Sequence, residues 1–396
     1  MKINITREID FPHLTKLERF RRMPELGPKI LFFSGGSALY RLSRLLVGYT
    51  HNSIHVVTPF DSGGSSAKLR DEFDMPAIGD IRHRLMALAD QSHFGNPEIF
   101  SLFAYRLPKE SSQEALRDEL SRMCSGKHPL IACIPNPMRK LIRNHLQKFE
   151  QYASSKFDLR GASIGNLILA AGYLDNRRHM DTVVYLFSKL VEVRGIVRPV
   201  VNISRHLCVR LENGEIICGQ HRFTGKERRK IDAKIESIHL VQHQASSEPA
   251  PAAVRKKMTA LIGTAELICY PMGSFYSSIL ATLLPKGVGK AISLNGSPKV
   301  FIPNTGDDPE CFGLTVMEQI EKLLHILQQD DPSRIAPHRV LNFVLLDENK
   351  SLYKGRLDRA ALEARGIQIV RGPLVSPASA PYVDEQRLLP MLLSFC

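Results

Sequence analysis

The chain has 396 residues, of which 43% are hydrophobic and 23% are charged. These proportions are ordinary for a folded globular protein and argue against a disordered or membrane-embedded chain. The longest apolar stretches, such as residues 30–33, are far shorter than the roughly 20 residues that a membrane span requires, and the charged N-terminus lacks the apolar core of a signal peptide. We therefore expect a globular protein that does not associate with membranes.

The seven cysteines are scattered along the chain without a CxxC pair. A chain of this length does not need disulfides to hold its core together, so a reducing compartment fits best and we predict a cytoplasmic protein. Cys208 and Cys218 lie on either side of a turn at Asn213-Gly214 and could approach each other. By the compartment argument we nevertheless expect both to be free thiols.

The formal net charge of +13 favours anions near the surface without saying which anions these are. The basic residues form short clusters, for example at 19–22 and 255–257, rather than one tail, and tryptophan is absent. No nucleic-acid-binding motif accompanies these clusters, which are typical of solvated helix faces. We therefore do not expect a nucleic-acid partner, and the sequence leaves a homodimer open.

After a basic N-terminal extension at residues 1–28, a short apolar run at 30–33 ends in glycines and predicts a buried strand. Leucines at helical spacing follow over 39–49, and residues 53–58 predict a second strand. The order strand, turn, helix, strand predicts a parallel sheet with right-handed crossovers. Such sheets bind ligands beyond the carboxyl ends of their strands.

Residues 78–91 predict a further helix, and residues 97–158 are mostly helical with proline breaks, as expected of an inserted segment. Helical spacing returns over 164–193. Period-two alternation over 198–220 surrounds Asn213-Gly214, the strongest short signal of a β-hairpin. A Ser/Pro/Ala-rich connection then leads back to the core.

Strand signals resume at 265–270, 299–302 and 340–346, each with helical sequence nearby. The predicted fold is therefore α/β, with a Rossmann-like three-layer core around a mostly parallel sheet. We expect a single domain over 29–396. It is interrupted by a helical insertion at 97–158 and by a β-hairpin and linker insertion at 196–258.

Gly35-Gly36-Ser37-Ala38 lies at the first predicted turn from strand to helix. Without side chains at the glycines, backbone amides can approach a phosphate, and the start of a helix adds its favourable dipole. A plain glycine turn that needs positive φ explains the segment equally well. The segment is neither GxGxxG nor GxxxxGK followed by Ser or Thr, so neither a dinucleotide fingerprint nor a P-loop is predicted.

A denser cluster of phosphate-binding groups follows the second predicted strand. It combines a carboxylate at the strand end with glycines, serine hydroxyls and cations. Asp61 could coordinate a hydrated Mg²⁺ ion, which prefers one or two carboxylates together with phosphate oxygens. A polar surface turn with Asp61 as a helix cap is the alternative. The predicted ligand contacts are Gly63, Gly64, Ser65, Ser66, Lys68 and Arg70.

Asp80 and Arg82 lie near the start of the next predicted helix, where the acid could cap the helix and the arginine could point to a ligand. Capping alone also explains this pair. Asn166, in the sequence Ile-Gly-Asn-Leu, could hydrogen-bond a base or ribose, or could cap a helix. We include all three residues in the predicted site.

Small and polar residues also follow two later strands. The first group lies between the predicted strand at 265–270 and the helix after it: Gly273, Ser274, Ser277 and Ser278. This setting suits phosphate, although a serine-rich helix cap has the same sequence signature. Asn304 follows the strand at 299–302 and is a further candidate. We assign no catalytic role to the lone histidines near these loops.

The order of these segments resembles the CofD/YvcK family. Six segments carry the resemblance: 35–38, similar to GGTG; 61–70, similar to DDGGSSGxLR; 79–82; 163–167; 213–219, similar to DGxxxxGE; and 271–279, similar to PGSxYTSI. Together they span most of the chain. The most similar group within the family is the CofD-related proteins of the GAK system.

The resemblance implies a Rossmann-like core whose strand-end loops bind a nucleotide diphosphate. CofD proteins transfer a phospholactyl-type group from a guanosine diphosphate-linked donor to a deazaflavin alcohol, using magnesium. YvcK proteins resemble UDP-sugar binders that regulate central carbon metabolism and the cell envelope. By this resemblance Asp61 and Arg82 are the candidate catalytic residues, with Asp61 as the magnesium ligand.

The sequence departs from the family pattern at three places. Ser62 stands where the pattern has a second aspartate, Gln220 replaces an expected glutamate, and Met272 displaces a glycine. The first change weakens a two-carboxylate metal site. We predict a protein that binds a nucleotide diphosphate or nucleotide sugar, as a CofD-like transferase or as a non-catalytic UDP-sugar-binding regulator. An NAD-dependent oxidoreductase is disfavoured because GxGxxG is absent.

Overall fold

The computed structural model describes residues 8, 10–92, 95–225 and 230–396. Its centre is a seven-stranded sheet with the order β10-β9-β8-β7-β1-β2-β3, in which neighbouring strands are parallel. The strands are β1 (Ile30–Ser34), β2 (Ile54–Val57), β3 (Ile196–Pro199), β7 (Leu267–Tyr270), β8 (Lys299–Phe301), β9 (Phe343–Asp347) and β10 (Gln368–Gly372). The predicted α/β fold is confirmed.

Strand β1 shows why helices cover both faces of the sheet. All of its residues are buried, with Leu31 and Phe33 in one apolar cluster and Ile30 and Phe32 in another. Because both faces are covered, the strand is a continuous apolar run rather than an alternating one. The helices that pack on the first face include α12 (Lys256–Gly263), α14 (Val288–Leu294) and α15 (Val316–Gln328); those on the second include α1 (Leu14–Arg22), α2 (Tyr40–Leu46) and α18 (Glu385–Ser394).

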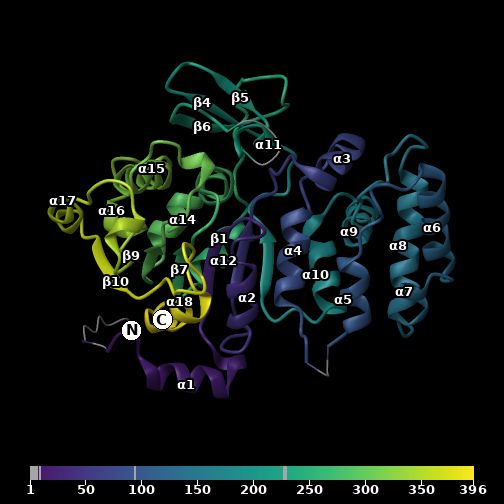
Figure 1. The fold of residues 1–396 in the computed structure, drawn as a ribbon, viewed down its shortest axis with the longest axis horizontal. Coiled ribbons are helices and arrows are strands. Elements are labelled where there is room, and N and C mark those ends of the chain that lie inside the picture. Colours follow the sequence, from purple (N-terminus) through teal and green to yellow (C-terminus); the bar gives the residue numbers. More distant parts are fainter. Residues whose placement is uncertain (1–7, 9, 93–94, 226–229) are drawn as a thin grey trace.

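A block of helices lies beside the β2 and β3 end of the sheet, on the right in Figure 1. It comprises α4 (Gly79–Leu88), α5 (Pro97–Ala104), α6 (Gln113–Ser125), α7 (Pro129–Ala132), α8 (Met138–Tyr152), α9 (Ile164–Asp175) and α10 (Met180–Leu190). One apolar cluster joins these helices to Val57 and Val197 of the sheet. The helical character predicted for 97–158 and 164–193 is confirmed. Among the described residues, no helix has the length and apolar character needed to cross a membrane.

The remaining helices are mostly short connections: α3 (Gly64–Phe73), α11 (Gln220–Phe223), α13 (Ala281–Leu283), α16 (Pro337–Val340), α17 (Arg359–Ala364) and the π-helical turn η2 (Phe275–Leu280). Helices α3 and η2 matter most for function because each directly follows a loop at the carboxyl end of a strand, β2 and β7 respectively. Strand β10 at the sheet edge was not predicted.

A second, antiparallel sheet with the order β5-β4-β6 lies at the top of the molecule in Figure 1. It contains β4 (His206–Leu211), β5 (Ile216–Cys218) and β6 (Ile235–Val241). The turn at Asn213-Gly214 joins β4 to β5, so the predicted hairpin is confirmed, whereas β6 was not predicted. Residues 196–199, which we placed in the second insertion, are strand β3 of the main sheet because they pair in parallel with β2.

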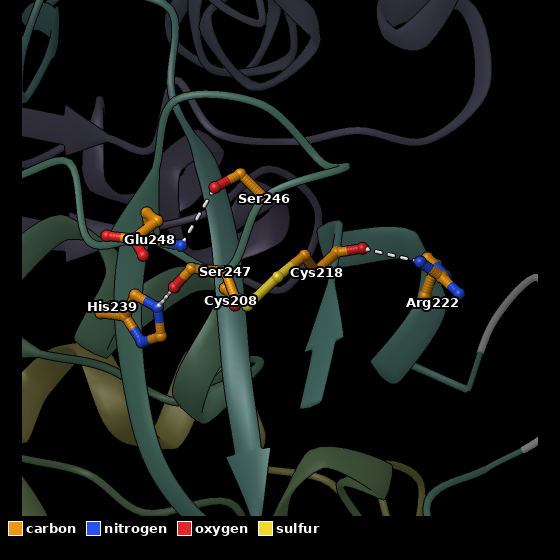
Figure 2. The surroundings of a disulfide bond; sticks show 7 residues. All are labelled: Cys208, Cys218, Arg222, His239, Ser246, Ser247 and Glu248. Carbon is orange, nitrogen blue, oxygen red and sulfur yellow. Dashed lines mark hydrogen bonds between the residues drawn. A yellow bond between two sulfur atoms is a disulfide. The ribbon is translucent and has the colours of Figure 1, made fainter. Parts of the chain in front are cut away.

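Cys208 and Cys218 form a disulfide between β4 and β5, shown in Figure 2. The hairpin register places the two residues directly opposite each other, with their Cα atoms 4.0 Å apart. The prediction that both are free thiols is therefore wrong, because the register of the hairpin brings the two side chains together on facing strands. The other five cysteines are free.

The disulfide makes a direct chemical prediction. Alkylation of the unfolded, unreduced protein should label five cysteines, and alkylation after reduction should label all seven. We also expect the double variant Cys208→Ser/Cys218→Ser to lose about 2–3 kcal/mol of unfolding free energy in urea titrations, because the short loop is no longer closed in the unfolded chain. Labelling of seven cysteines without reductant would contradict the disulfide.

Candidate ligand-binding site

A cavity of about 310 Å³ lies at the carboxyl ends of β1, β2 and β7. The strand order reverses between β1 and β7, and open α/β sheets bind ligands at such a reversal. Most of the predicted site residues line this cavity: Gly35, Gly36, Ser37, Asp61, Gly63, Gly64, Ser65, Ser66, Asp80, Arg82, Asn166, Gly273, Ser274, Ser277 and Ser278. Residues far apart in the sequence thus meet at one place.

The first glycine loop is held from behind by Arg84, a fully buried side chain of α4. Its guanidinium Nη2 donates to the carbonyl oxygen of Gly35 at 2.8 Å, and Nη1 donates to that of Leu39 at 3.0 Å. Burial lowers the pKa of Arg84 to about 10, so the group stays charged at neutral pH. One buried cation therefore fixes both ends of the loop that borders the cavity.

Close packing explains why this loop contains glycines. A Cβ atom on Gly35 would lie 2.2 Å from Oγ of Ser278, and one on Gly36 would lie 2.2 Å from Oδ1 of Asp80. Neither glycine has a positive φ, so the plain-turn explanation does not apply. The missing side chains instead allow η2 and α4 to approach the loop.

A second buried arginine holds the loop after β2. Nη1 of Arg70 donates to the carbonyl oxygens of Phe60 at 3.1 Å and Asp61 at 2.8 Å, and Nη2 donates to that of Arg205 at 2.6 Å. In the loop itself, the amide of Gly63 donates to Oδ1 of Asp61 at 3.1 Å. Arg70 is therefore a support of the loop and lies outside the cavity lining, although we predicted it as a ligand contact.

Lys68 also lies outside the cavity lining. Its ammonium group is 2.7 Å from Oδ2 of Asp158 and 2.8 Å from the carbonyl oxygen of Arg160. Lys68 therefore ties α3 to the segment that follows α8, and its phosphate contact stays a prediction.

Cations gather on one wall of the cavity. Arg82 and Arg106 both line it, and Nη1 of Arg82 donates to the carbonyl oxygen of Phe103 at 3.1 Å. Nε of Arg82 is buried without a hydrogen-bond partner. Burial and the neighbouring arginines lower the pKa of His83 to about 4, so this histidine is neutral at neutral pH. Arg82 and Arg106 therefore make their part of the lining cationic, while the carboxylates of Asp61 and Asp80 line the same cavity.

Arg106 was missed by the sequence analysis because it follows α5, far from any glycine motif. Asn166 was predicted, and the structure places it opposite the second loop, where its Nδ2 donates to Oγ of Ser65 at 2.9 Å. Its Oδ1 is buried without a hydrogen-bond partner. Both side chains line the cavity.

The loop after β7 is ordered by acidic residues. Oε2 of Glu310 accepts from the amide of Ser277 at 2.8 Å, and Oε1 accepts from the hydroxyl of Ser277 at 2.5 Å. Ser277 is thus already engaged, which leaves Ser274 and Ser278 as the better ligand contacts of this loop. Asn304 bonds to the amide and the carbonyl group of Gly273 at 2.8 and 2.6 Å, so it supports the loop rather than lining this cavity.

Helix α11 closes the cavity from the antiparallel sheet, and the sequence analysis did not anticipate this. Gln220, His221 and Thr224 all line the cavity. Nδ1 of His221 lies 2.9 Å from Oγ of Ser62, and the amide of Ser62 is 3.5 Å from Oε1 of Gln220. The two departures from the family pattern, at Ser62 and Gln220, therefore contact each other. Cys218 of the disulfide lies directly before this helix (Figure 2).

The chain matches the family described as 2-phospho-L-lactate transferase CofD over residues 30–375. It belongs to the CofD family. A gluconeogenesis factor of Bacillus subtilis (strain 168) is 28% identical over 367 residues, covering 88% of this chain and 92% of that protein. A putative gluconeogenesis factor of Thermoanaerobacterium thermosulfurigenes is 27% identical over 383 residues, covering 93% and 96%. The predicted resemblance to CofD and YvcK proteins is confirmed.

A crystal structure of a UPF0052-family protein from Bacillus halodurans has the same fold, with a TM-score of 0.64 and 22% sequence identity. The superposition covers 93% of this chain and 99% of that one. This CofD-family chain therefore shares the fold of the Bacillus halodurans protein over nearly its whole length.

The support that Arg84 gives the first loop can be measured. We expect Arg84→Met to lower the free energy of unfolding by at least about 3 kcal/mol, because it leaves several buried oxygen atoms without a donor. The matched control is Arg44→Met on the exposed face of α2, which should change it by less than about 0.5 kcal/mol. Equal effects of the two variants in urea titrations would show that Arg84 does not support the loop.

Proposed function

We propose that the cavity binds a nucleotide diphosphate or nucleotide sugar, with its diphosphate between the loops after β1 and β2. The observation that carries this proposal is that two glycine- and serine-rich loops, on adjacent parallel strands, border the same cavity as Arg82 and Arg106. Glycine loops let backbone amides approach phosphate oxygens, and arginine adds charge-assisted hydrogen bonds. A bound diphosphate would use both kinds of donor, the backbone amides of the glycine loops and the arginine side chains.

Electrostatics supports an anionic ligand in particular. Burial lowers the pKa of Arg82 to about 10, which reflects the cost of keeping this cation away from water. Repulsion from Arg106 acts in the same direction. A phosphate beside both arginines would offset part of this cost and would offer an acceptor to the unpartnered Nε of Arg82.

A second cavity, of about 690 Å³, adjoins the first. The two share part of their lining, including Ser37, His83 and Gly273, and the second continues past Asn304 to Tyr382. A ligand with its diphosphate in the first cavity therefore has room to extend a sugar or another linked group into the second. Together the two cavities fit an elongated ligand better than a free phosphate.

Magnesium would fit beside Asp61. This carboxylate and that of Asp80 line the cavity, and one or two carboxylates together with phosphate oxygens and water are the ligands that Mg²⁺ prefers. Among the described residues, no group of three or more histidine, cysteine or acidic side chains could hold a metal ion by itself. The ion would supply positive charge to the phosphates when bound.

Two functions use the same cavity. In a CofD-like transferase, Asp61 would hold the magnesium ion and Arg82 would stabilise charge on the departing phosphate, while the barrier falls mainly through positioning. The description of the matched family favours this function. In a regulator, the bound nucleotide sugar would instead change the affinity for a partner. The gluconeogenesis-factor names of the relatives favour this second function.

Calorimetric titration with UDP-sugars, GDP, GTP and NAD tests the shared premise. We expect one of the diphosphate ligands to bind, and Gly35→Ala to weaken its affinity at least about tenfold, because the new Cβ would collide with Ser278. Gly263→Ala is the matched control, since a Cβ there meets nothing within 4 Å and the affinity should not change. If none of the ligands binds the wild-type protein, the proposal fails.

A turnover assay separates the two functions. With magnesium, GDP- or UDP-linked donors and acceptors from a cell extract, we expect transfer of the donor's phospho-linked group and a fall of at least about tenfold in Asp61→Asn. Arg82→Gln should also lower the rate, because it removes a charge beside the phosphates. Binding without any transfer product in the wild-type protein would identify the regulator.

A further inference from the structure

A separate cavity of about 530 Å³ lies along the outer edge of strand β3. Its walls are α10 on one side and the start of α12 on the other, and its floor continues from β3 into residues 200–203. No residue lines both this cavity and the one at the strand ends. The size falls within the range of about 300–1,000 Å³ that is usual for small-molecule sites. We call it the β3 cavity.

The β3 cavity is apolar at its floor. Val197 and Val200 are buried, while Ile196 and Tyr185 keep 37% and 60% of their surface exposed. Met258 of α12 completes the apolar lining. Exposed apolar side chains that gather around a concave site mark a place where an apolar ligand body removes area from water.

The rim of the β3 cavity is cationic. Four basic residues and one acidic residue line it: Lys189, Arg198, Arg255, Lys257 and Asp181. Asp181 lies 3.7 Å from Arg198 and 3.4 Å from Lys257, so its charge is shared by two cations. Within the described ranges, no carboxylate lies at ion-pair distance from Lys189 or Arg255. The Lys189 ammonium lies 5.7 Å from the centre of the Tyr185 ring, and Lys189 and Arg255 are the two cations of the rim that can meet an anionic ligand without first breaking an ion pair.

We propose that the β3 cavity is a second ligand site for a small organic anion with an apolar body, such as a carboxylate or phosphate ester on an aliphatic or aromatic group. The apolar body would cover Ile196 and Tyr185, and the anionic head would meet Arg255 and Lys189. This site is independent of the nucleotide site, because the two cavities share no lining residue.

The edge of β3 is poorly suited to the alternative occupant, an added peptide strand. Pro199 has no amide hydrogen to donate, and the guanidinium of Arg198 already donates to the carbonyl oxygen of Val197 at 3.2 Å. An incoming strand would therefore find few backbone groups to pair with. A compact ligand needs only the apolar floor and the cationic rim.

Fluorescence titration with anilinonaphthalene sulfonate, an anionic aromatic probe, tests the proposal on the folded full-length protein. We expect saturable binding that decanoate displaces. Arg255→Glu should weaken probe binding at least about tenfold, because a favourable charge becomes a repulsive one. Lys256→Glu is the matched control: it makes the same charge change in the next residue, which does not line the cavity, and it should leave binding unchanged.

A second variant tests the apolar part of the site, although the Tyr185 ring also lies 5.7 Å from the Lys189 ammonium. Tyr185→Ala removes an exposed ring and should not unfold the protein, yet it should weaken both the probe and decanoate. Circular dichroism before each titration confirms that the variants are folded. The proposal is overturned if the probe does not saturate, if decanoate fails to displace it, or if Arg255→Glu and Lys256→Glu bind equally well.

Discussion

The candidate site depends on buried guanidinium groups that hold backbone carbonyl oxygens. Arg84 donates hydrogen bonds to carbonyl oxygens of the loop after β1, and Arg70 donates to carbonyl oxygens of the loop after β2. A guanidinium has five donors in a rigid plane, so one side chain can fix several carbonyl groups at once. Lysine, with a single flexible ammonium, could not do this equally well. The loops are therefore positioned by the interior of the protein.

The same arrangement sets the electrostatics of the cavity. Arg84 and Arg70 are engaged with carbonyl groups and stay behind the loops, whereas Arg82 and Arg106 line the cavity itself. Burial lowers the pKa of Arg82 and Arg84 to about 10, but both stay cationic at neutral pH. The reversal of the strand order between β1 and β7 brings Arg82, Arg106 and the loop after β7 to the same cavity. The position of the cavity and its two arginines are thus the features that support the proposed anionic ligand.

Local sequence patterns were enough to predict five of the seven strands of the main sheet, the helical block and most of the cavity lining, whereas β10 was not predicted and β3 was assigned to an insertion. The glycine and serine residues at 35–37 and 63–66 directly follow apolar strands, and parallel strands bring their carboxyl ends together. Patterns of this kind do not report long-range contacts. Arg106 lies far from any motif, and His221 follows the segment 213–219 on the separate antiparallel sheet, so local patterns did not place either residue at the cavity.

The errors have a similar physical origin. Arg70 and Lys68 belong to a phosphate-like motif, but a motif does not say on which side of the loop a long side chain lies, and the structure turns both away from the cavity. For Cys208 and Cys218, the hairpin turn already implied two cysteines on facing strands. Chain length and the scatter of the cysteines do not report which pairs face each other, whereas the hairpin register does.

The contact between Ser62 and helix α11 shows how the antiparallel sheet is joined to the loop after β2 at the cavity. The amide of Ser62 lies 3.5 Å from Oε1 of Gln220, and the Ser62 hydroxyl lies 2.9 Å from Nδ1 of His221, so the two departures from the family pattern meet through the backbone of Ser62. A backbone amide and a side-chain amide oxygen form this contact, and neither group carries a formal charge. Asp61 remains as the only carboxylate of its loop, so a cation bound together with a phosphate ligand would find only Asp61 and Asp80 as carboxylates in the described lining of the cavity.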